Sequence, residues 1–335
     1  MPAETTIGSH EGDDVQARRP SAHVSLSRVG LTGMEKVIRS RAHGREEIFY
    51  AELDCFVDLN PRQKGAHMSR FEETVNEAIE AILLDEAFRA ETLAQHIAER
   101  VRERQGGLRA EVTIAARYPE QRMTPVSGQR SQEIHTLYGS AVSSARGTRR
   151  LVGVQAQGMT ACPCAQEMVA ARSRERLAEQ GFGADDVDRI LESVPVATHN
   201  QRGLGTLWVG CPEDCEGGVE ADTLLRIVER SMSSEIYELM KRSDEVEVVE
   251  TAHRRPRFVE DCVREMIAAA VAHYAHVGED GFVMARQENL ETIHRHNVVA
   301  ERYGLIGELA RELSSDEPAA RHVTMREWLE GPPAG

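Results

Sequence analysis

The sequence predicts an α+β fold in which each half of the chain carries β-strands around a helical pair. Three observations support this prediction. Strand-like and helix-like segments alternate, the same order occurs in both halves, and 41% hydrophobic residues suffice for a sizeable core. No literal repeat accompanies the repeated order. We therefore expect two tandem units at 29–160 and 161–315, between a disordered tail at 1–28 and a loose tail at 316–335.

In the first half, strands are expected at 47–59, 111–118 and 151–159. Residues 47–59 (EIFYAELDCFVDL) combine β-favouring side chains with partial alternation. Residues 71–105 repeat apolar side chains at three-to-four spacing with a break near Asp85, which predicts two helices. The strand at 151–159 leads directly to Cys162.

In the second half, the pattern predicts strands at 205–209, 246–249 and 282–285. A charged helix is expected near 164–192. A second helix is expected at 221–242. A third opens at Pro256, since proline is tolerated in the first turn and its successors carry an apolar stripe.

The charge balance excludes two classes of partner. The chain has 55 acidic and 40 basic side chains and a formal net charge of −15, which opposes non-specific binding to nucleic acid or anionic membranes.

The longest apolar run, Met266 to Ala272, is far shorter than the roughly 20 residues that span a bilayer. The N-terminal residues lack an apolar signal core, so we expect a cytoplasmic protein.

A Cys-Pro-Cys sequence is the sharpest chemical feature. It lies in GMTACPCAQ at 158–166, where the expected strand ends. Proline between the cysteines restricts the backbone of the turn, and thiolates are both metal ligands and nucleophiles. Two structural thiols in a turn are the alternative interpretation of Cys162 and Cys164.

Two further cysteines offer a competing metal site. Cys211 and Cys215 (CPEDC) could join Cys162 and Cys164 in a four-thiolate structural zinc site. The protein would then be a zinc-stabilised binding module without catalysis. Against this hypothesis, the Cys-x-Cys spacing is tighter than usual and the site leaves the histidines unused.

Three polar segments carry further candidate residues. His199 lies in THNQRG, a stretch too polar for a core. Glu245 lies in KRSDE at an expected helix-to-strand junction, where a solvated charge run is the ordinary interpretation. Glu260 lies in RFVED, in the first turn of an expected helix, where the helix dipole alone can explain an acidic residue.

The segment QENLETIHRHN at 287–297 holds Glu291, His294 and His296. His294 and His296 share a face if the backbone is extended, and Glu291 and His294 do so if it is helical. Two histidines beside a glutamate indicate metal binding or a polar loop.

A basic loop precedes the first expected helix. Arg62, Lys64, His67 and Arg70 lie within DLNPRQKGAHMSRF at 58–71. Near a helix N-terminus such side chains can receive phosphate, although a solvated basic loop is the alternative.

Taken in chain order, DLNPRQKGAHMSRF, GMTACPCAQ, THNQRG, KRSDE, RFVED and ETIHRHN resemble the GTP cyclohydrolase IB superfamily, and within it the archaeal-type enzymes of methanopterin synthesis. The resemblance covers roughly residues 31–312. The resemblance implies a tunnelling fold with two tandem units of antiparallel sheet, a homotetramer, and active sites at interfaces. It also implies opening of the guanine imidazole ring of GTP at C8, release of formate and formation of a dihydroneopterin phosphate. Against that family, residues 168–194 form a long helical insert where the bacterial enzymes have a short spacer. The insert favours the archaeal-type 2′,3′-cyclic phosphate over the triphosphate.

The resemblance also implies residue roles. The metal-site residues would be Cys162, His199, Glu245 and His294, with Cys162 preferred to Cys164. Glu260 would anchor the purine, and Glu291 would be a supporting acidic residue. Cys164, His67 and His296 are candidates for proton transfer, and substrate would be bound by Lys64, Arg70 and Arg202.

This ligand set suits one divalent metal, for which iron(II) is favoured and manganese or zinc are alternatives. A nitrile reductase of the same fold, which uses a nucleophilic cysteine and NADPH, is the alternative enzyme. The segments of Glu245 and His294 argue against it.

Overall fold

The computed structural model describes residues 15–42, 45–81, 88–212, 218–315, 318 and 321–331. They form one eight-stranded antiparallel sheet in which every strand pairs with its neighbour in sequence. The strands are β1 (Leu26–Ala42), β2 (Arg45–Leu59), β3 (Arg109–Met123), β4 (Arg130–Ser144), β5 (Gly147–Ala161), β6 (Asn200–Cys211), β7 (Phe282–Leu290) and β8 (Val298–Leu305). The predicted α+β class is confirmed.

The helices in the described part of the chain are α1 (Met68–Ala81), α2 (Ala90–Gln105), α3 (Pro163–Glu179), α4 (Ala184–Ser193), α5 (Ala221–Ser231), α6 (Arg242–Arg254), α7 (Val259–His273), α8 (Ile306–Ser315) and α9 (Met325–Glu330), with a 3₁₀ turn at Ala275–Val277. Two strands, two helices and two strands therefore occur twice, as β1β2α1α2β3β4 and β5β6α5α7β7β8. This order is the tunnelling fold. The expected boundary after residue 160 stays a prediction, because one sheet continues through it.

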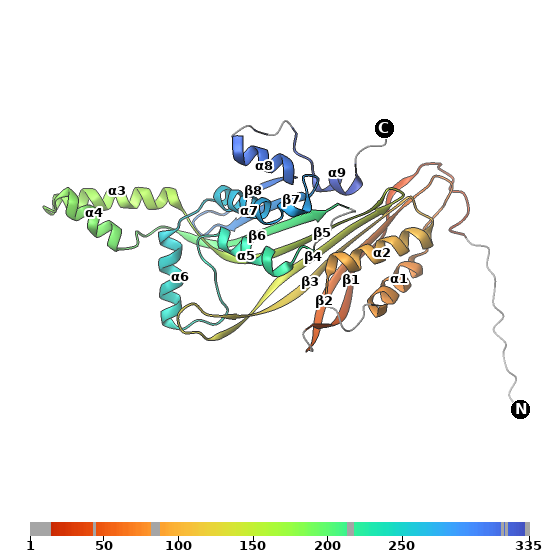
Figure 1. Cartoon of the computed structure of the whole chain (residues 1–335), viewed down its shortest axis with the longest axis horizontal. Helices are drawn as coiled ribbons and strands as arrows, with labels where there is room; N and C mark the ends of the chain where they lie inside the picture. Colours follow the sequence, from red (N-terminus) through yellow and green to blue (C-terminus); the bar gives the residue numbers. More distant parts are fainter. Residues whose placement is uncertain are drawn as a thin grey trace, which may run out of the picture.

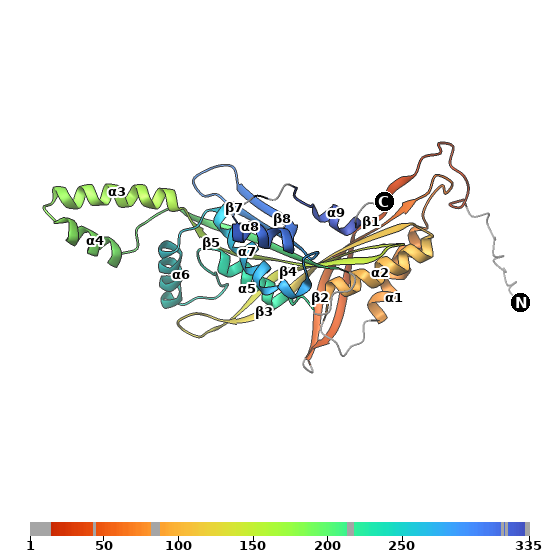
Figure 2. The ribbon, with the colours of Figure 1, turned by 45° about the horizontal axis from the view of Figure 1, so that its top comes forward.

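The main core lies between the sheet and α1, α2, α5 and α7, which cover the same face of the sheet (Figures 1 and 2). Val152 and Val283 belong to this core, whereas their neighbours Leu151 and Phe282 point to the opposite face. There they pack with Trp328 of α9. Side chains of a strand alternate between faces, so the C-terminal helix covers part of the face that the helix pairs leave open.

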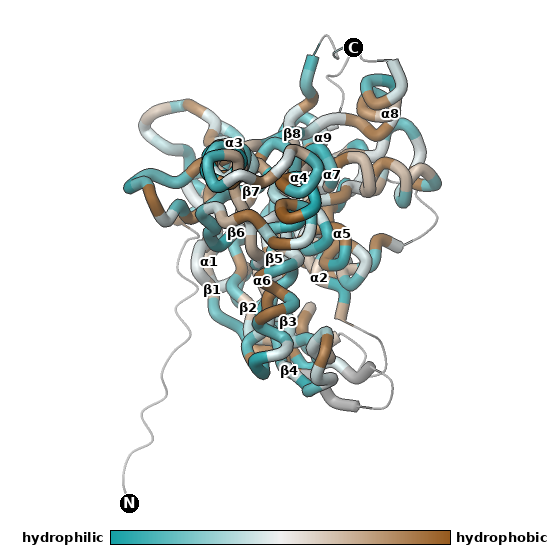
Figure 3. The backbone as a smooth tube through the Cα atoms, turned by 90° about the vertical axis from the view of Figure 1, so that its left-hand side faces the viewer, coloured by the Kyte–Doolittle hydropathy of each residue, from teal (hydrophilic) through white to brown (hydrophobic). Residues whose placement is uncertain are grey.

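The predicted insert is an arm of two helices, α3 and α4, that projects from the end of the sheet (Figures 1 and 2). None of the side chains of α3 is buried, and Val187 is the buried side chain of α4. Seen from the side of the arm, hydrophilic residues predominate along α3 (Figure 3). The arm therefore adds little to the core of the chain.

Two expectations about elements were wrong. Residues 246–249, expected as a strand, lie within α6, because Asp244, Val248 and Ala252 are buried at helical spacing. The helix expected over 221–242 ends at Ser231. Strands β1, β4 and β8 were not predicted, and β1 begins at Leu26, inside the tail expected to lack structure.

The sheet divides at one place, next to the end of β5. β4 pairs with β5 from Thr136 onward, and the remainder of the β3–β4 hairpin separates from it. The segment 232–241, between α5 and α6, takes up the vacated edge, where Ser234 bridges Met159. Among the described helices, none is long and apolar enough to cross a membrane.

Candidate active site

Cys162 follows β5 directly and caps the N-terminus of α3. Its Sγ accepts a hydrogen bond from the backbone N–H of Ala165 at 3.5 Å, and Pro163 occupies the first helical position. Proline suits that position because its missing N–H would have no partner there. Cys162 is half-buried, whereas Cys164 is exposed. The strand-to-helix turn thus holds one thiol inside the structure and presents the other to solvent.

His199 lies beside Cys162. The Cys162 N–H donates to the His199 carbonyl at 3.1 Å, and the Thr198 hydroxyl donates to the Cys162 carbonyl at 2.7 Å. His199 Nδ1 is 3.1 Å from Oε1 of the buried Gln201. An amide oxygen only accepts, so Nδ1 carries the proton and Nε2 keeps the lone pair that a metal ligand needs.

Glu291, the residue after β7, lies next to His199. Its Oε2 lies 3.9 Å from His199 Nδ1, and its side chain is 7% exposed. Oε2 is buried and has no hydrogen-bond partner in the described structure. A buried carboxylate oxygen without a partner is costly, so the position calls for a cation or a donor. The sulfur, nitrogen and oxygen donors of Cys162, His199 and Glu291 at this end of the sheet are of the types that suit a borderline divalent metal.

Glu260 is connected to this end of the sheet through Arg257. The Arg257 N–H donates to the carbonyl of Ala161, which precedes Cys162, at 2.9 Å. Glu260 follows in the first turn of α7 and is exposed. It lines a cavity of about 400 Å³ between α7, β8 and α8, together with Val263 and Ile267. That volume is within the range of small-molecule sites.

Glu245 is not brought to Cys162 by the contacts of the described residues. It is exposed in the first turn of α6, next to Asp244, which accepts hydrogen bonds from Val126 and Ser127 of the β3–β4 turn. The opposite end of α6 approaches α3, where Gln166 donates to the His253 carbonyl at 2.5 Å. At 1.5 Å per residue, Glu245 lies roughly 12 Å along the helix from that contact.

The remaining residues predicted at this edge lie on its surface. His294 and His296 are exposed on the loop after Glu291, with their rings stacked at 5.2 Å. The loop is fixed to the start of β6, since the Thr292 hydroxyl donates to the Asn200 carbonyl at 3.0 Å. Arg202 is exposed on β6.

The basic loop lies at the other end of the sheet. The backbone N–H of His67 donates to Oε1 of Gln105, and the His67 carbonyl accepts from Nε2 of the same side chain. These bonds join the loop to the end of α2, and Lys64 and Arg70 are exposed. This end is where β5 begins, and Cys162 follows 15 residues of strand later. At about 3.3 Å per residue, the two ends are roughly 50 Å apart.

The four-thiolate zinc hypothesis is wrong for a site within one chain. Cys211 pairs with Arg150 near the start of β5, whereas Cys162 follows the far end of that strand. The Cys211 sulfur is also engaged in a disulfide bond. Cys215 lies outside the described residues.

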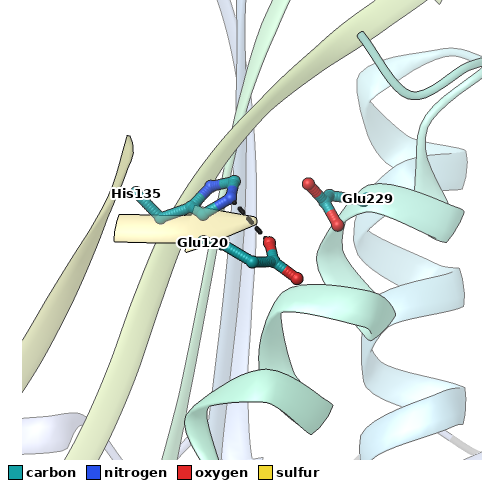
Figure 4. Close-up of side chains that lie close together, drawn as sticks. All are labelled: Glu120, His135 and Glu229. Carbon is teal, nitrogen blue, oxygen red and sulfur yellow. Dashed lines mark hydrogen bonds and ion pairs between the residues drawn. The ribbon is translucent and has the colours of Figure 1, made fainter. Parts of the chain in front are cut away.

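A buried cluster that the sequence did not reveal lies under α5. Glu120 of β3, His135 of β4 and Glu229 of α5 have ligand atoms within 4.8 Å of one another (Figure 4). His135 Nε2 is 3.0 Å from Glu120 Oε2. Arg122 contacts both carboxylates, through Nε to Glu120 at 2.8 Å and through Nη2 to Glu229.

Arg122 determines whether this cluster can bind a metal ion. Its fixed positive charge neutralises much of the carboxylate charge and would repel a divalent cation at the centre. We therefore interpret the cluster as an ion-pair network. Burial raises the pKa of Glu229 to about 7 in spite of Arg122, whereas Glu120 has a lowered pKa because its bonds to His135 and Arg122 outweigh its burial.

Comparison with known proteins identifies the family. The family model described as "Type I GTP cyclohydrolase folE2" matches residues 13–300. "GTP cyclohydrolase MptA" of Methanococcus aeolicus is 41% identical over 307 residues, which cover 90% of this chain and 99% of that protein. The protein of the same name from Methanocaldococcus jannaschii is 39% identical over 310 residues, covering 91% and 98%.

Among solved structures, a uricase from Arthrobacter globiformis aligns with 83% of this chain and 93% of its own, at 9% identity and a TM-score of 0.49. The family match does not support the nitrile reductase alternative, and it covers the segments of Cys162, His199, Glu260 and Glu291. The chain belongs to the type I GTP cyclohydrolase family and is an enzyme of that family.

Proposed function

We propose that this enzyme hydrolyses the imidazole ring of GTP at C8, releases formate and forms a 7,8-dihydroneopterin phosphate. The observation that supports the proposal is that Cys162, His199 and the unpartnered carboxylate oxygen of Glu291 lie at one end of the sheet. Opening an aromatic ring with water at neutral pH needs a hydroxide nucleophile. A bound divalent metal supplies one by lowering the pKa of water from ~16 to ~7.

Within this chain, Cys162 Sγ and His199 Nε2 would hold the metal, with His294 contributed by the adjacent loop. Gln201 fixes the His199 ring in the ligand form. Glu291, whose Oε2 faces the protonated Nδ1 of His199, would be a supporting acidic residue that orients this ring or a water molecule. The donor set is compatible with iron(II), manganese and zinc, and we favour iron(II).

Glu260 would bind the guanine. A carboxylate can accept from the N1–H and the exocyclic amine at once, which distinguishes guanine from adenine. The Arg257–Ala161 hydrogen bond keeps the first turn of α7 beside the turn that carries Cys162. The exposed Cys164 and His296 lie at the same end of the molecule and are suited to proton transfer.

We further propose that a second copy of the chain completes each site. Lys64, His67 and Arg70 would bind the triphosphate, but roughly 50 Å separates their end of the sheet from Cys162 in one chain. The exposed Glu245, remote from Cys162 within its own chain, would likewise reach a partner's site. A homotetramer with sites between copies meets both requirements.

The two possible products differ in how much diphosphate the reaction releases. A 2′,3′-cyclic phosphate keeps one phosphorus atom of GTP and therefore releases the other two as diphosphate, whereas a triphosphate product releases none. The long α3–α4 insert and the similarity to proteins named MptA favour the cyclic phosphate. Phosphorus NMR of the reaction mixture, together with mass spectrometry of the pterin, separates the two products.

The central test combines metal analysis with formate release from GTP. Enzyme purified without oxygen is assayed with and without added iron(II), manganese or zinc. We expect Cys162→Ala and His199→Ala to lose both metal and turnover, while Glu260→Gln keeps metal and binds GTP more weakly. His253→Ala serves as the control, because its Nδ1 contacts the Val249 carbonyl on α6. Normal metal content in both Cys162→Ala and His199→Ala would overturn the proposal.

A further inference from the structure

Ala161, the residue before Cys162, is held on both of its backbone groups by another part of the chain. Its N–H donates to the hydroxyl oxygen of Ser233 at 3.1 Å, and its carbonyl accepts from the N–H of Arg257 at 2.9 Å. Ala161 and Ser233 are both fully buried. The next residue is bonded to the other side of β5, since the Cys162 N–H donates to the carbonyl of His199, the residue before β6.

Ser233 lies on the segment 232–241, which fills the edge that β4 leaves open. The N–H groups of Ser233 and Ser234 donate to the Met159 carbonyl at 2.9 and 3.1 Å, and the Met159 N–H donates to the Ser234 carbonyl at 2.9 Å. The last residues of β5 are thus bonded to β6 on one edge and to this segment on the other. Without the segment, the strand that delivers Cys162 would end at an open edge.

The segment itself is anchored by the buried ion-pair network. Arg122 of β3 contacts Glu229, at the end of α5, and Glu235, at 3.5 Å. Farther along, the Glu238 N–H donates to Glu133 and the Leu239 N–H donates to the hydroxyl of Ser131, both on β4. The segment is therefore fixed between the β3–β4 hairpin and the end of β5.

Arg257 connects the same place to the purine side of the site. Its backbone holds Ala161, and its guanidinium donates to the Ser231 carbonyl, at the end of α5, at 2.8 Å. Three residues later comes Glu260. One short path of hydrogen bonds thus links the turn of Cys162 to the start of α7.

We propose that Ser233 and Arg257 are positioning residues, which clamp Ala161 and thereby set where the Cys162 thiolate lies relative to His199 and Glu260. The inference rests on the proposed role of Cys162 as a metal ligand. Arg122 supports the clamp from a distance by fixing the segment that carries Ser233. Residues that orient a metal ligand through one hydrogen bond typically change metal affinity when they are removed.

The test compares Ser233→Ala with Ser234→Ala. Ser234 is the adjacent buried residue, and its hydroxyl donates to the Glu235 carbonyl within the segment, so its removal leaves Ala161 untouched. Cobalt(II) is titrated into the metal-free enzyme, and its thiolate charge-transfer band reports coordination by Cys162. We expect Ser233→Ala to bind cobalt about tenfold more weakly, and Ser234→Ala to match the wild type.

A second measurement uses no metal. The reaction of Cys162 with a thiol reagent is followed in a Cys164→Ser background, with Cys162→Ala in that background as the blank. Ser233→Ala should raise the rate several-fold, because the released strand end opens more often. Arg122→Lys keeps the positive charge but cannot contact both carboxylates with separate guanidinium nitrogens. It should weaken cobalt binding and raise the thiol reaction rate, each by less than Ser233→Ala does.

The outcomes are separable. If wild-type enzyme shows no cobalt–thiolate band, the metal-site proposal fails, and the thiol rates still decide whether Ser233 holds Cys162. If Ser233→Ala equals Ser234→Ala in both cobalt affinity and thiol rate, the clamp is overturned. Thermal unfolding of the two variants shows whether a change exceeds general destabilisation.

Discussion

At the scale of single residues, the site depends on a few backbone hydrogen bonds that fix otherwise ordinary side chains. Cys162, His199 and Glu291 come from three separate segments, and the antiparallel pairing of β5, β6 and β7 aligns their ends. The sequence predicted these three residues from motifs. It gave no signal for Ser233 or Arg122, because their roles depend on contacts between residues far apart in the chain.

A prediction at this scale concerns Glu229 and pH. Its pKa is raised to about 7 by burial, so between pH 4.5 and 7 the folded state keeps a proton that the unfolded state releases. This contribution is therefore present at low pH and is lost as pH rises through 7. Relative to Glu229→Gln, the wild type should lose about 1 kcal/mol of unfolding free energy between pH 6 and pH 8.

Chemical denaturation at several pH values measures this difference. Glu167→Gln, at an exposed position on α3, is the control and should show no such dependence. A Glu229→Gln difference that stays constant from pH 6 to pH 8 would show that Arg122 keeps the carboxylate ionised throughout.

At the scale of elements, hydrophobic alternation predicted β2, β3 and β5 but missed β4. The buried positions of β4 include Ser131, Glu133 and His135, whose polarity hides the pattern. The valines of 246–249 favoured a strand, yet α6 forms because its spacing of four buries Val248 and Ala252. Local propensity therefore failed where polar networks and tertiary burial determine the element.

The contact between α2 and β4 gives a second prediction. A Cβ on Gly139 would lie 2.2 Å from the carbonyl carbon of Ala90, in the first turn of α2, and a backbone atom cannot swing away. Gly139→Ala should therefore cost about 1–3 kcal/mol of unfolding free energy, because helix and strand must separate. Gly65→Ala, with its nearest atom at 3.6 Å, should cost less than about 0.5 kcal/mol.

Both variants are compared with the wild type by urea unfolding. Equal losses in Gly139→Ala and Gly65→Ala would mean that α2 can shift at no cost, contrary to the close packing seen here.

At the scale of the whole molecule, motif order alone did not show that the basic loop and Cys162 occupy opposite ends of the sheet. The direction and length of the strands determine that separation, and a motif predicts neither of them. Under the proposed function, one chain therefore carries two half-sites. A mixture of two differently damaged chains therefore tests the arrangement.

We expect Cys162→Ala and Lys64→Ala to be inactive separately and to regain turnover when they are mixed under conditions of subunit exchange. If each site takes one end from each of two copies, about one quarter of the sites in a random mixture are intact. Cys162→Ala mixed with His199→Ala is the control, because both residues belong to the same end. Equal activity in the two mixtures would contradict the shared site.

The order of the sheet also bears on how the chain is made. Each strand pairs with the strand synthesised just before it, so pairing of an early strand does not require a strand that is synthesised much later. The first four strands and the α1–α2 pair can associate before the second half of the chain has been synthesised. The clamp on Ala161 forms only after residues 233 and 257 have emerged, so the end of β5 that leads to Cys162 is completed long after the start of the same strand has been made.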